Sequence, residues 1–210
     1  MAKPFLSDAA QQALSRAVLA VEAASSAELV IAVRPAAASY FAADLLAGAA
    51  AAFAALAVLL YSRWTFGLHW FLLDPLVVGA LAVWAASRSP ALRRALTPAA
   101  ERRRRVETAA RALFVERRVH RTSGRTGILL YIALLEREAA LVVDLGVEPV
   151  AATAGWRAAV AALAEAVRRG EDGTAVAARV EALAGVLAPV LVHAADDVNE
   201  LEDTLDEARR

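Results

Sequence analysis

The sequence predicts an α/β domain that is interrupted by a two-helix transmembrane hairpin. Hydrophobic residues make up 59% of the 210 residues, and the mean hydropathy is +0.47. Ordinary soluble domains contain roughly 45–50% apolar residues, so part of this chain is expected to lie in lipid. Two long apolar stretches hold much of the excess, and short segments rich in Val, Ile and Leu lie on both sides of them. The length suits one compact domain with an accessory element.

Residues 1–35 are expected to form a helix and the first strand of the α/β domain. Apolar residues recur at helical spacing over 8–24, and Ser7 is well placed to cap this helix. The following segment over 27–33 reads AELVIAV, is rich in β-branched residues, and ends just before Pro35. A strand needs partners, so this one must pair with segments that lie beyond the apolar stretches.

The two apolar stretches, 41–61 and 66–86, are predicted to be transmembrane helices. A helix needs about 20 apolar residues to cross a 30 Å hydrocarbon layer, and both stretches are long enough. The first contains a single charged residue, Asp44, and the second contains only His69 and Asp74 as ionisable groups. We expect His69 and Asp74 to lie near the outer membrane surface, where their side chains can reach the headgroups.

The distribution of arginines predicts the orientation of the hairpin. The connection between the two stretches carries only Arg63, whereas seven arginines lie between residues 88 and 105. Loops that stay in the cytoplasm carry an excess of Lys and Arg, so both termini are expected to be cytoplasmic. Trp64 and Trp84 lie near the predicted interfaces, as aromatic residues of membrane proteins often do. We therefore expect a multi-pass protein of the cell (inner) membrane.

Residues 88–125 form a basic segment that is expected to be mainly helical. It contains 12 arginines and three glutamates, a net charge of +9, although the whole chain is neutral. Each cation beside an anionic leaflet contributes about 1 kcal/mol of attraction, so anionic lipid headgroups are the expected partner. Two other interpretations are a topology signal with no further role and a nucleic-acid surface, and the second conflicts with the overall neutrality. The candidate lipid contacts are Arg93, Arg94, Arg102, Arg103, Arg104 and Arg105.

Residues 126–192 are expected to complete the α/β domain. Two apolar segments separated by the polar turn LERE predict a strand hairpin, and helical spacing returns after Pro149. The acidic segment 194–210 has a net charge of −5 and spaces Val198, Leu201 and Leu205 as an amphipathic helix does. The remaining expected elements are helix 97–121, strands 126–134 and 139–146, and helices 152–169 and 174–192.

These segments, taken in order, resemble the TPM domain family. The resemblance covers residues 25–34 and 106–192, with the hairpin inserted after the first strand. It rests on the motifs AELVIAV, ETAARALFVERRV, GILLYIAL and LVVDLGVE. It implies a small three-layer α/β/α domain. Some family members are acid phosphatases or bind divalent ions, others act in photosystem repair or as receptor accessories, and many bacterial members are tethered to membranes.

Three residues are the candidate ligand-binding groups: Asp144, Glu148 and Arg125. In the family, an Asp-Asn-Gly turn that supplies metal ligands usually precedes the strand at 127–134, and Arg125 stands here where an acid is usual. A hard cation takes about six oxygen ligands, several of them carboxylates, and two acids beside an arginine make a poor site. The structural alternative is that the two carboxylates pair with Arg125 or Arg137. We therefore expect no metal.

The sequence favours a non-catalytic interaction or assembly module over an enzyme. The absence of cysteine excludes disulfides and thiolate chemistry, and no phosphate-binding loop or nucleophile motif is present, so we expect no cofactor and no catalytic residue. The main alternative is a membrane-bound TPM-type phosphatase or divalent-ion-binding protein. A third hypothesis, an oligomeric transporter lined by His69 and Asp74, needs several hairpins. Another protein, or a second copy of this chain, remains open as a partner.

The orientation can be tested directly, because the natural chain has no cysteine. We expect Ser62→Cys to react with a membrane-impermeant maleimide added outside intact cells, and Ser123→Cys to react only after permeabilisation. Equal labelling of both variants in intact cells would contradict the predicted topology.

Overall fold

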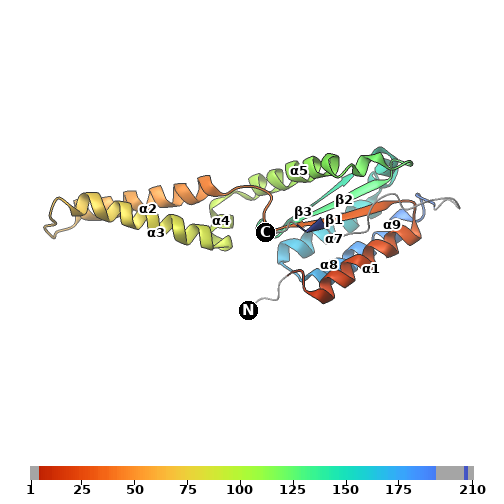
Figure 1. Cartoon of the computed structure of the whole chain (residues 1–210), viewed down its shortest axis with the longest axis horizontal. Helices are drawn as coiled ribbons and strands as arrows, with labels where there is room; N and C mark the ends of the chain where they lie inside the picture. Colours follow the sequence, from red (N-terminus) through yellow and green to blue (C-terminus); the bar gives the residue numbers. More distant parts are fainter. Residues whose placement is uncertain (1–4, 193–205, 208–210) are drawn as a thin grey trace. The chain divides into compact units, whose positions relative to one another are not determined.

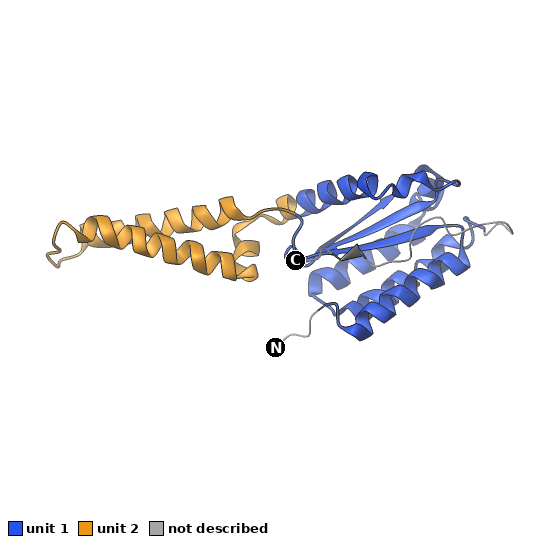
Figure 2. Cartoon of the chain, in the orientation of Figure 1, with its two compact units in different colours: residues 1–37, 103–210 blue, residues 38–102 orange. Residues whose placement is uncertain are grey.

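The computed structural model describes residues 5–192 and 206–207 and has a mixed α/β fold. The chain divides into two compact units (Figure 2). The α/β unit comprises Met1–Ala37 and Arg103–Arg210, and the hairpin unit comprises Ala38–Arg102. One continuous stretch of chain is thus inserted into a domain whose two parts are far apart in sequence.

The α/β unit is built on a sheet of order β3-β2-β1-β4 (Figure 1). β1 and β2 are parallel and pair from Glu28↔Gly127 to Arg34↔Ala133. β3 lies antiparallel to β2, and the short β4 lies parallel to β1. The strands are β1 (Glu28–Arg34), β2 (Gly127–Ala133), β3 (Glu138–Val143) and β4 (Asp206–Glu207).

Helix α5 (Ala99–Glu116) makes the parallel pairing possible. A parallel neighbour needs a connection that carries the chain back to the starting end of the first strand. At 1.5 Å per residue, 18 residues span about 27 Å, which is enough to pass along a seven-residue strand. α5 therefore serves as the crossover helix, and its first four residues, 99–102, belong to the hairpin unit.

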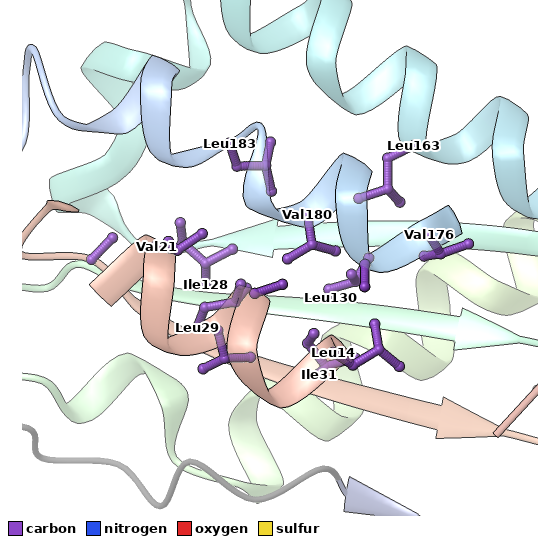
Figure 3. Packing of buried hydrophobic residues seen from close by; sticks show 14 of the residues in the cluster. Leu14, Val21, Leu29, Ile31, Ile128, Leu130, Leu163, Val176, Val180 and Leu183 are labelled. Carbon is purple, nitrogen blue, oxygen red and sulfur yellow. The ribbon is translucent and has the colours of Figure 1, made fainter. Parts of the chain in front are cut away.

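The two faces of the sheet belong to two separate hydrophobic clusters. Leu29, Ile31 and Leu130 pack with helices of one cluster (Figure 3), whereas Leu129 and Tyr131 pack with α5 in the other. This division follows from the alternation of side chains along a strand. Helices α1, α7, α8 and α9 supply side chains to the first cluster, and α6 supplies Val150 and Ala151. They are α1 (Asp8–Ala24), α6 (Glu148–Ala151), α7 (Ala154–Arg169), α8 (Gly173–Glu181) and α9 (Ala184–Leu187).

The end of the predicted helix 97–121 is wrong. α5 ends at Glu116, Arg118 adopts the left-handed conformation with φ of 56°, and a 3-10 turn, η1, follows over Val119–Arg121. Left-handed residues commonly end helices, but glycine usually takes that position. An arginine there gives no warning in the sequence that the helix stops.

Two further predicted helices also differ from the structure. The segment 174–192 forms two helices, α8 and α9, with a break at Ala182 and Leu183, before Pro189 is reached. Of the tail 194–210, the described residues are Asp206 and Glu207, and they form strand β4 rather than part of a helix. The rest of the predicted tail helix lies outside the described residues.

The hairpin unit contains helices α2 (Phe41–Tyr61), α3 (Trp70–Arg88) and α4 (Pro90–Leu96). α2 and α3 are long and apolar enough to cross a membrane, with mean hydropathies of 2.1 and 1.6. Only 17% and 11% of their most apolar windows are buried within the protein, so most of this apolar surface is exposed. A third, bent candidate over Leu145–Arg169 buries Leu163 and Val167 in the core of the α/β unit.

Helix α3 begins and ends later than the predicted range 66–86 of the second apolar helix. α3 starts at Trp70, because Gly67 and its neighbours form a turn in which the Trp70 N–H donates to the Gly67 carbonyl. At its other end α3 continues to Arg88, and a cation at a helix C-terminus is favourable.

Two glycines bring α2 and α3 into close contact. A Cβ on Gly48 would lie 2.9 Å from the Gly79 carbonyl oxygen, and a Cβ on Gly79 would lie 3.1 Å from the Ala52 Cβ. Small residues allow this close approach in membrane helix pairs. These small residues therefore pack the two helices of one hairpin against each other.

Gly127 gives a sharp test of the α/β unit. A Cβ at this position would overlap the Val119 backbone oxygen, at 2.1 Å, so the Gly127→Ala variant must move backbone. We expect a loss of about 1–3 kcal/mol in stability, measured as a lower Tm of the purified protein. Gly185→Ala is the matched control, because no atom lies within 4 Å of its added Cβ. Equal Tm values for the two variants would contradict the packing described here.

Candidate functional site

Arg125 and Asp144 form a bidentate ion pair at the edge of the sheet. Arg125 Nε donates to Asp144 Oδ2 at 2.8 Å, and Arg125 Nη2 donates to Oδ1 at 3.0 Å. Asp144 is buried, whereas the Arg125 side chain is half exposed. The hydrogen bonds from the guanidinium to Asp144 raise the pKa of Arg125 above its ordinary value. Of the partners considered from the sequence, Arg125 is therefore the one that Asp144 binds.

The backbone holds this pair in place. Arg125 has a left-handed conformation with φ of 54°, and its carbonyl accepts from the Gly146 N–H at 2.8 Å. A Cβ on Gly146 would lie 2.6 Å from the Gly124 carbonyl oxygen, so a larger residue would push the two loops apart. The close approach of these loops fixes Arg125 beside the end of β3.

In this arrangement the Asp144 carboxylate is poorly placed for metal binding or acid–base chemistry. Asp144 Oδ1 also accepts from the Leu145 N–H at 2.8 Å, so the carboxylate has three donors around it. Glu148 is exposed at the start of α6. In the described parts of the chain, no group of three or more His, Asp or Glu side chains is placed to hold a metal ion. The described geometry of Arg125 and Asp144 is that of a structural ion pair.

A second bidentate pair lies in the hairpin unit. Arg93 Nε donates to Asp44 Oδ1 at 2.9 Å, and Arg93 Nη2 donates to Oδ2 at 2.5 Å. The Asp44 side chain is 4% exposed and that of Arg93 is 24% exposed, so the pair is largely shielded from solvent. Asp44 raises the pKa of Arg93 by accepting these hydrogen bonds. The pair links the start of α2 to α4.

Arg102 is also engaged within the hairpin unit. Its Nη1 donates to the carbonyl oxygens of Arg94 and Thr97, at 2.8 and 2.7 Å. These carbonyls lie at the C-terminal end of α4, where a cation is favourable. Arg102 therefore stabilises the end of α4.

The six candidate lipid contacts thus have different surroundings. Arg93 and Arg102 bind groups of the protein, and Arg94 and Arg105 are partly buried with partners of their own. Arg103 and Arg104 are exposed on α5, and Arg103 Nε lies 3.0 Å from Glu107 Oε1 in a surface ion pair. Surface pairs of this kind contribute about 0–1 kcal/mol, so they release a cation easily. Arg103 and Arg104 are the most accessible of the six.

Three features of the structure were not predicted from the sequence. They are the Asp44–Arg93 pair, the burial of Glu136, and the exposed loop that carries Arg118 and Arg121. The sequence assigned Asp44 no partner, but a charge in an apolar segment usually needs one, and that rule points to a cation such as Arg93. Glu136, in the turn after β2, is 1% exposed and accepts from the Ala37 N–H at 2.9 Å. Exposed Arg118 and Arg121 lie in the loop after α5, about 20 Å along that helix from Arg103.

A cavity of about 500 Å³ lies in the α/β unit beside the turn between β2 and β3. Its lining includes Phe5, Leu134, Arg137 and Asp172. Asp172 already accepts from the Ala175 N–H at 2.9 Å and caps α8. Among the described residues that line the cavity there is no serine, threonine or histidine, and we assign the cavity no chemistry.

Comparison with known proteins identifies a fold but no family. No family model and no curated protein matches the chain. The NMR structure of the BA42 protein from the psychrophilic bacterium Bizionia argentinensis is similar in fold, with a TM-score of 0.59 and 14% sequence identity. The match covers 99% of this chain and 98% of that one. At this identity the likeness extends to the fold alone.

The Asp44–Arg93 pair generates a prediction for the hairpin unit. Asp44→Asn would leave Arg93 without its counter-charge in a shielded position, so we expect a Tm lower by several degrees. We also expect faster tryptic cleavage after Arg93, because α4 is no longer tied to α2. Glu107→Gln is the control, since it removes a surface ion pair and should change neither quantity. Unchanged Tm and cleavage in Asp44→Asn would show that the pair does not secure α4.

Proposed function

We propose that this protein is a membrane-tethered, non-catalytic interaction or assembly module of the TPM type. The observation that carries the proposal is the exposed apolar hairpin inserted between β1 and α5 of an otherwise compact α/β unit. The two hydrophobic clusters on the faces of the sheet support a three-layer α/β/α arrangement. The order of strands and helices agrees with the TPM resemblance read from the sequence motifs.

The absence of catalysis is proposed from the state of Asp144. This carboxylate is buried and holds a guanidinium and a backbone N–H, so it is not available to a substrate or a metal ion. Glu148 is an exposed carboxylate at a helix start, which is an ordinary structural position. We propose that the α/β unit acts by binding.

The membrane location is proposed from the hairpin and from the arginines around it. Both termini are placed in the cytoplasm, at the inner membrane of a bacterial cell, because arginines are dense after α3 and rare in the connection between α2 and α3. Trp84 is exposed near the end of α3, and the Arg88 guanidinium lies 5.3 Å from its ring centroid. Such aromatic and cationic pairs suit a membrane interface.

Anionic lipid is the proposed partner of the second turn of α5. Arg103 and Arg104 are exposed there, only a short segment after the proposed second span. Each cation near an anionic leaflet contributes about 1 kcal/mol, so the two together favour contact of α5 with the inner leaflet. A protein partner or a second copy could occupy the other faces of the α/β unit.

The lipid contact can be tested in nanodiscs. An environment-sensitive fluorophore on Ala112→Cys, an exposed position of α5, should shift to the blue when anionic lipid replaces zwitterionic lipid. Arg103→Gln with Arg104→Gln should abolish the shift. Arg168→Gln with Arg169→Gln is the matched control, because these adjacent arginines of α7 also pair with a glutamate three or four residues away.

Two results would contradict the proposal. A shift that persists without Arg103 and Arg104 would remove anionic lipid as the partner of α5. Turnover of a phosphate monoester by the purified protein, lost in Asp144→Ala, would favour the alternative of a membrane-bound TPM-type phosphatase.

A further inference from the structure

Helix α4 has an apolar exposed face. Ala91, Leu92, Ala95 and Leu96 are all exposed, and Leu92 and Leu96 retain 39% and 41% of their accessible surface. Their spacing of one, three and four residues places them on one side of the helix. The side of α4 that faces away from the hairpin unit therefore carries no charge.

The arginines of α4 are directed toward the protein. Arg93 binds the buried Asp44, and Arg94 is partly buried with a partner of its own. Arg102 donates to the Arg94 carbonyl at 2.8 Å and so covers the end of the helix. A helix on a water-exposed surface has the opposite arrangement, with apolar residues inside and charges outside.

We infer that α4 lies in the boundary between the headgroups and the acyl chains of the bilayer, with its Ala-Leu face toward the chains. This inference rests on the proposed membrane hairpin and adds a membrane contact at α4 to its two spans and to the lipid contact proposed for α5. Amphipathic helices at this boundary bury their apolar face about 5–10 Å into the membrane. Arg88, which precedes Pro90 by two residues, packs against exposed Trp84, so an interfacial anchor lies immediately before α4.

The size of the face favours lipid over a protein partner. Four small or medium side chains cannot supply the roughly 800 Å² per partner of a stable protein interface. The face also follows directly in the chain from the exposed surface of α3, so lipid that covers α3 can continue over α4. Asp44 binds Arg93 in the middle of α4, and Arg102 binds a carbonyl near the end of the helix. These contacts keep the apolar face of α4 in one orientation.

Fluorophore depth measurements on the full chain in nanodiscs test this inference. Ala91→Cys and Ala95→Cys report on α4, Phe53→Cys reports on the exposed middle of α2, and Thr174→Cys reports on an exposed position of α8. Aqueous iodide and nitroxide lipids, labelled near the headgroup or deep in the chain, serve as quenchers. We expect the iodide quenching constant of the labels at positions 91 and 95 to be several-fold lower than that of the label at position 174. We also expect the shallow nitroxide to quench the labels at positions 91 and 95.

The controls separate failure of the inference from failure of the proposed function. If the deep nitroxide quenches the label at position 53 while the labels at positions 91 and 95 behave like the one at position 174, the hairpin spans the membrane but α4 does not touch it. If 53 also behaves like 174, the membrane hairpin itself is wrong. Protection of 91 and 95 from iodide and from both nitroxides would mean that a protein surface covers α4, and would overturn the lipid assignment.

Discussion

β1 and β2 pair in parallel along seven residues, although the whole hairpin and α5 separate them in sequence. A parallel pair needs its crossover to start at one end of the sheet and to finish at the other. An insertion can be tolerated in such a crossover only if it returns the chain close to where it left. An antiparallel helix pair does so, because α2 and α3 have 21 and 19 residues and approach closely at Gly48 and Gly79.

The point of insertion is secured from both sides. The N–H groups of Leu134 and Leu135 donate to the carbonyls of Arg34 and Pro35, and buried Glu136 holds the Ala37 N–H. The turn after β2 thus fixes the chain up to Ala37, the residue immediately before the hairpin unit. Ala37 packs against the same cluster as Val106 of α5, so the two ends of the inserted segment meet at one hydrophobic site.

Two bidentate Arg–Asp pairs determine which charged side chains of the two units are already bound within the protein. In the α/β unit, Arg125 occupies the carboxylate that a metal ion or substrate would need. In the hairpin unit, Arg93 satisfies the one acid at the start of α2 and turns the charged side of α4 inward. The same kind of ion pair occupies the candidate ligand-binding site in one unit and leaves an apolar helix face exposed in the other. Both effects favour a role in tethering and binding over catalysis.

The local elements were predictable from the sequence where capping and periodicity agree. The predicted helix 8–24 matches α1, because Ser7 caps it and its apolar residues recur regularly. The end of α5 could not be predicted, because Arg118 takes a left-handed position in which glycine is usual. The Asp44–Arg93 pair joins residues far apart in sequence, so no local pattern contains it. Arg125, by contrast, was one of the two arginines, with Arg137, that the sequence offered as a partner for Asp144.

Removal of the hairpin tests whether β1 and β2 form one domain across the inserted segment. Residues 1–37 would be joined to 103–210 by a short Gly-Ser linker, and the product compared with residues 103–210 alone. We expect the joined chain to be a soluble monomer with a cooperative thermal transition and strong amide protection in β2. The shorter fragment, which lacks β1 and α1, should show neither. Failure of the joined chain to fold, or equal folding of both, would contradict the claim that β1 and β2 form one domain across an inserted hairpin.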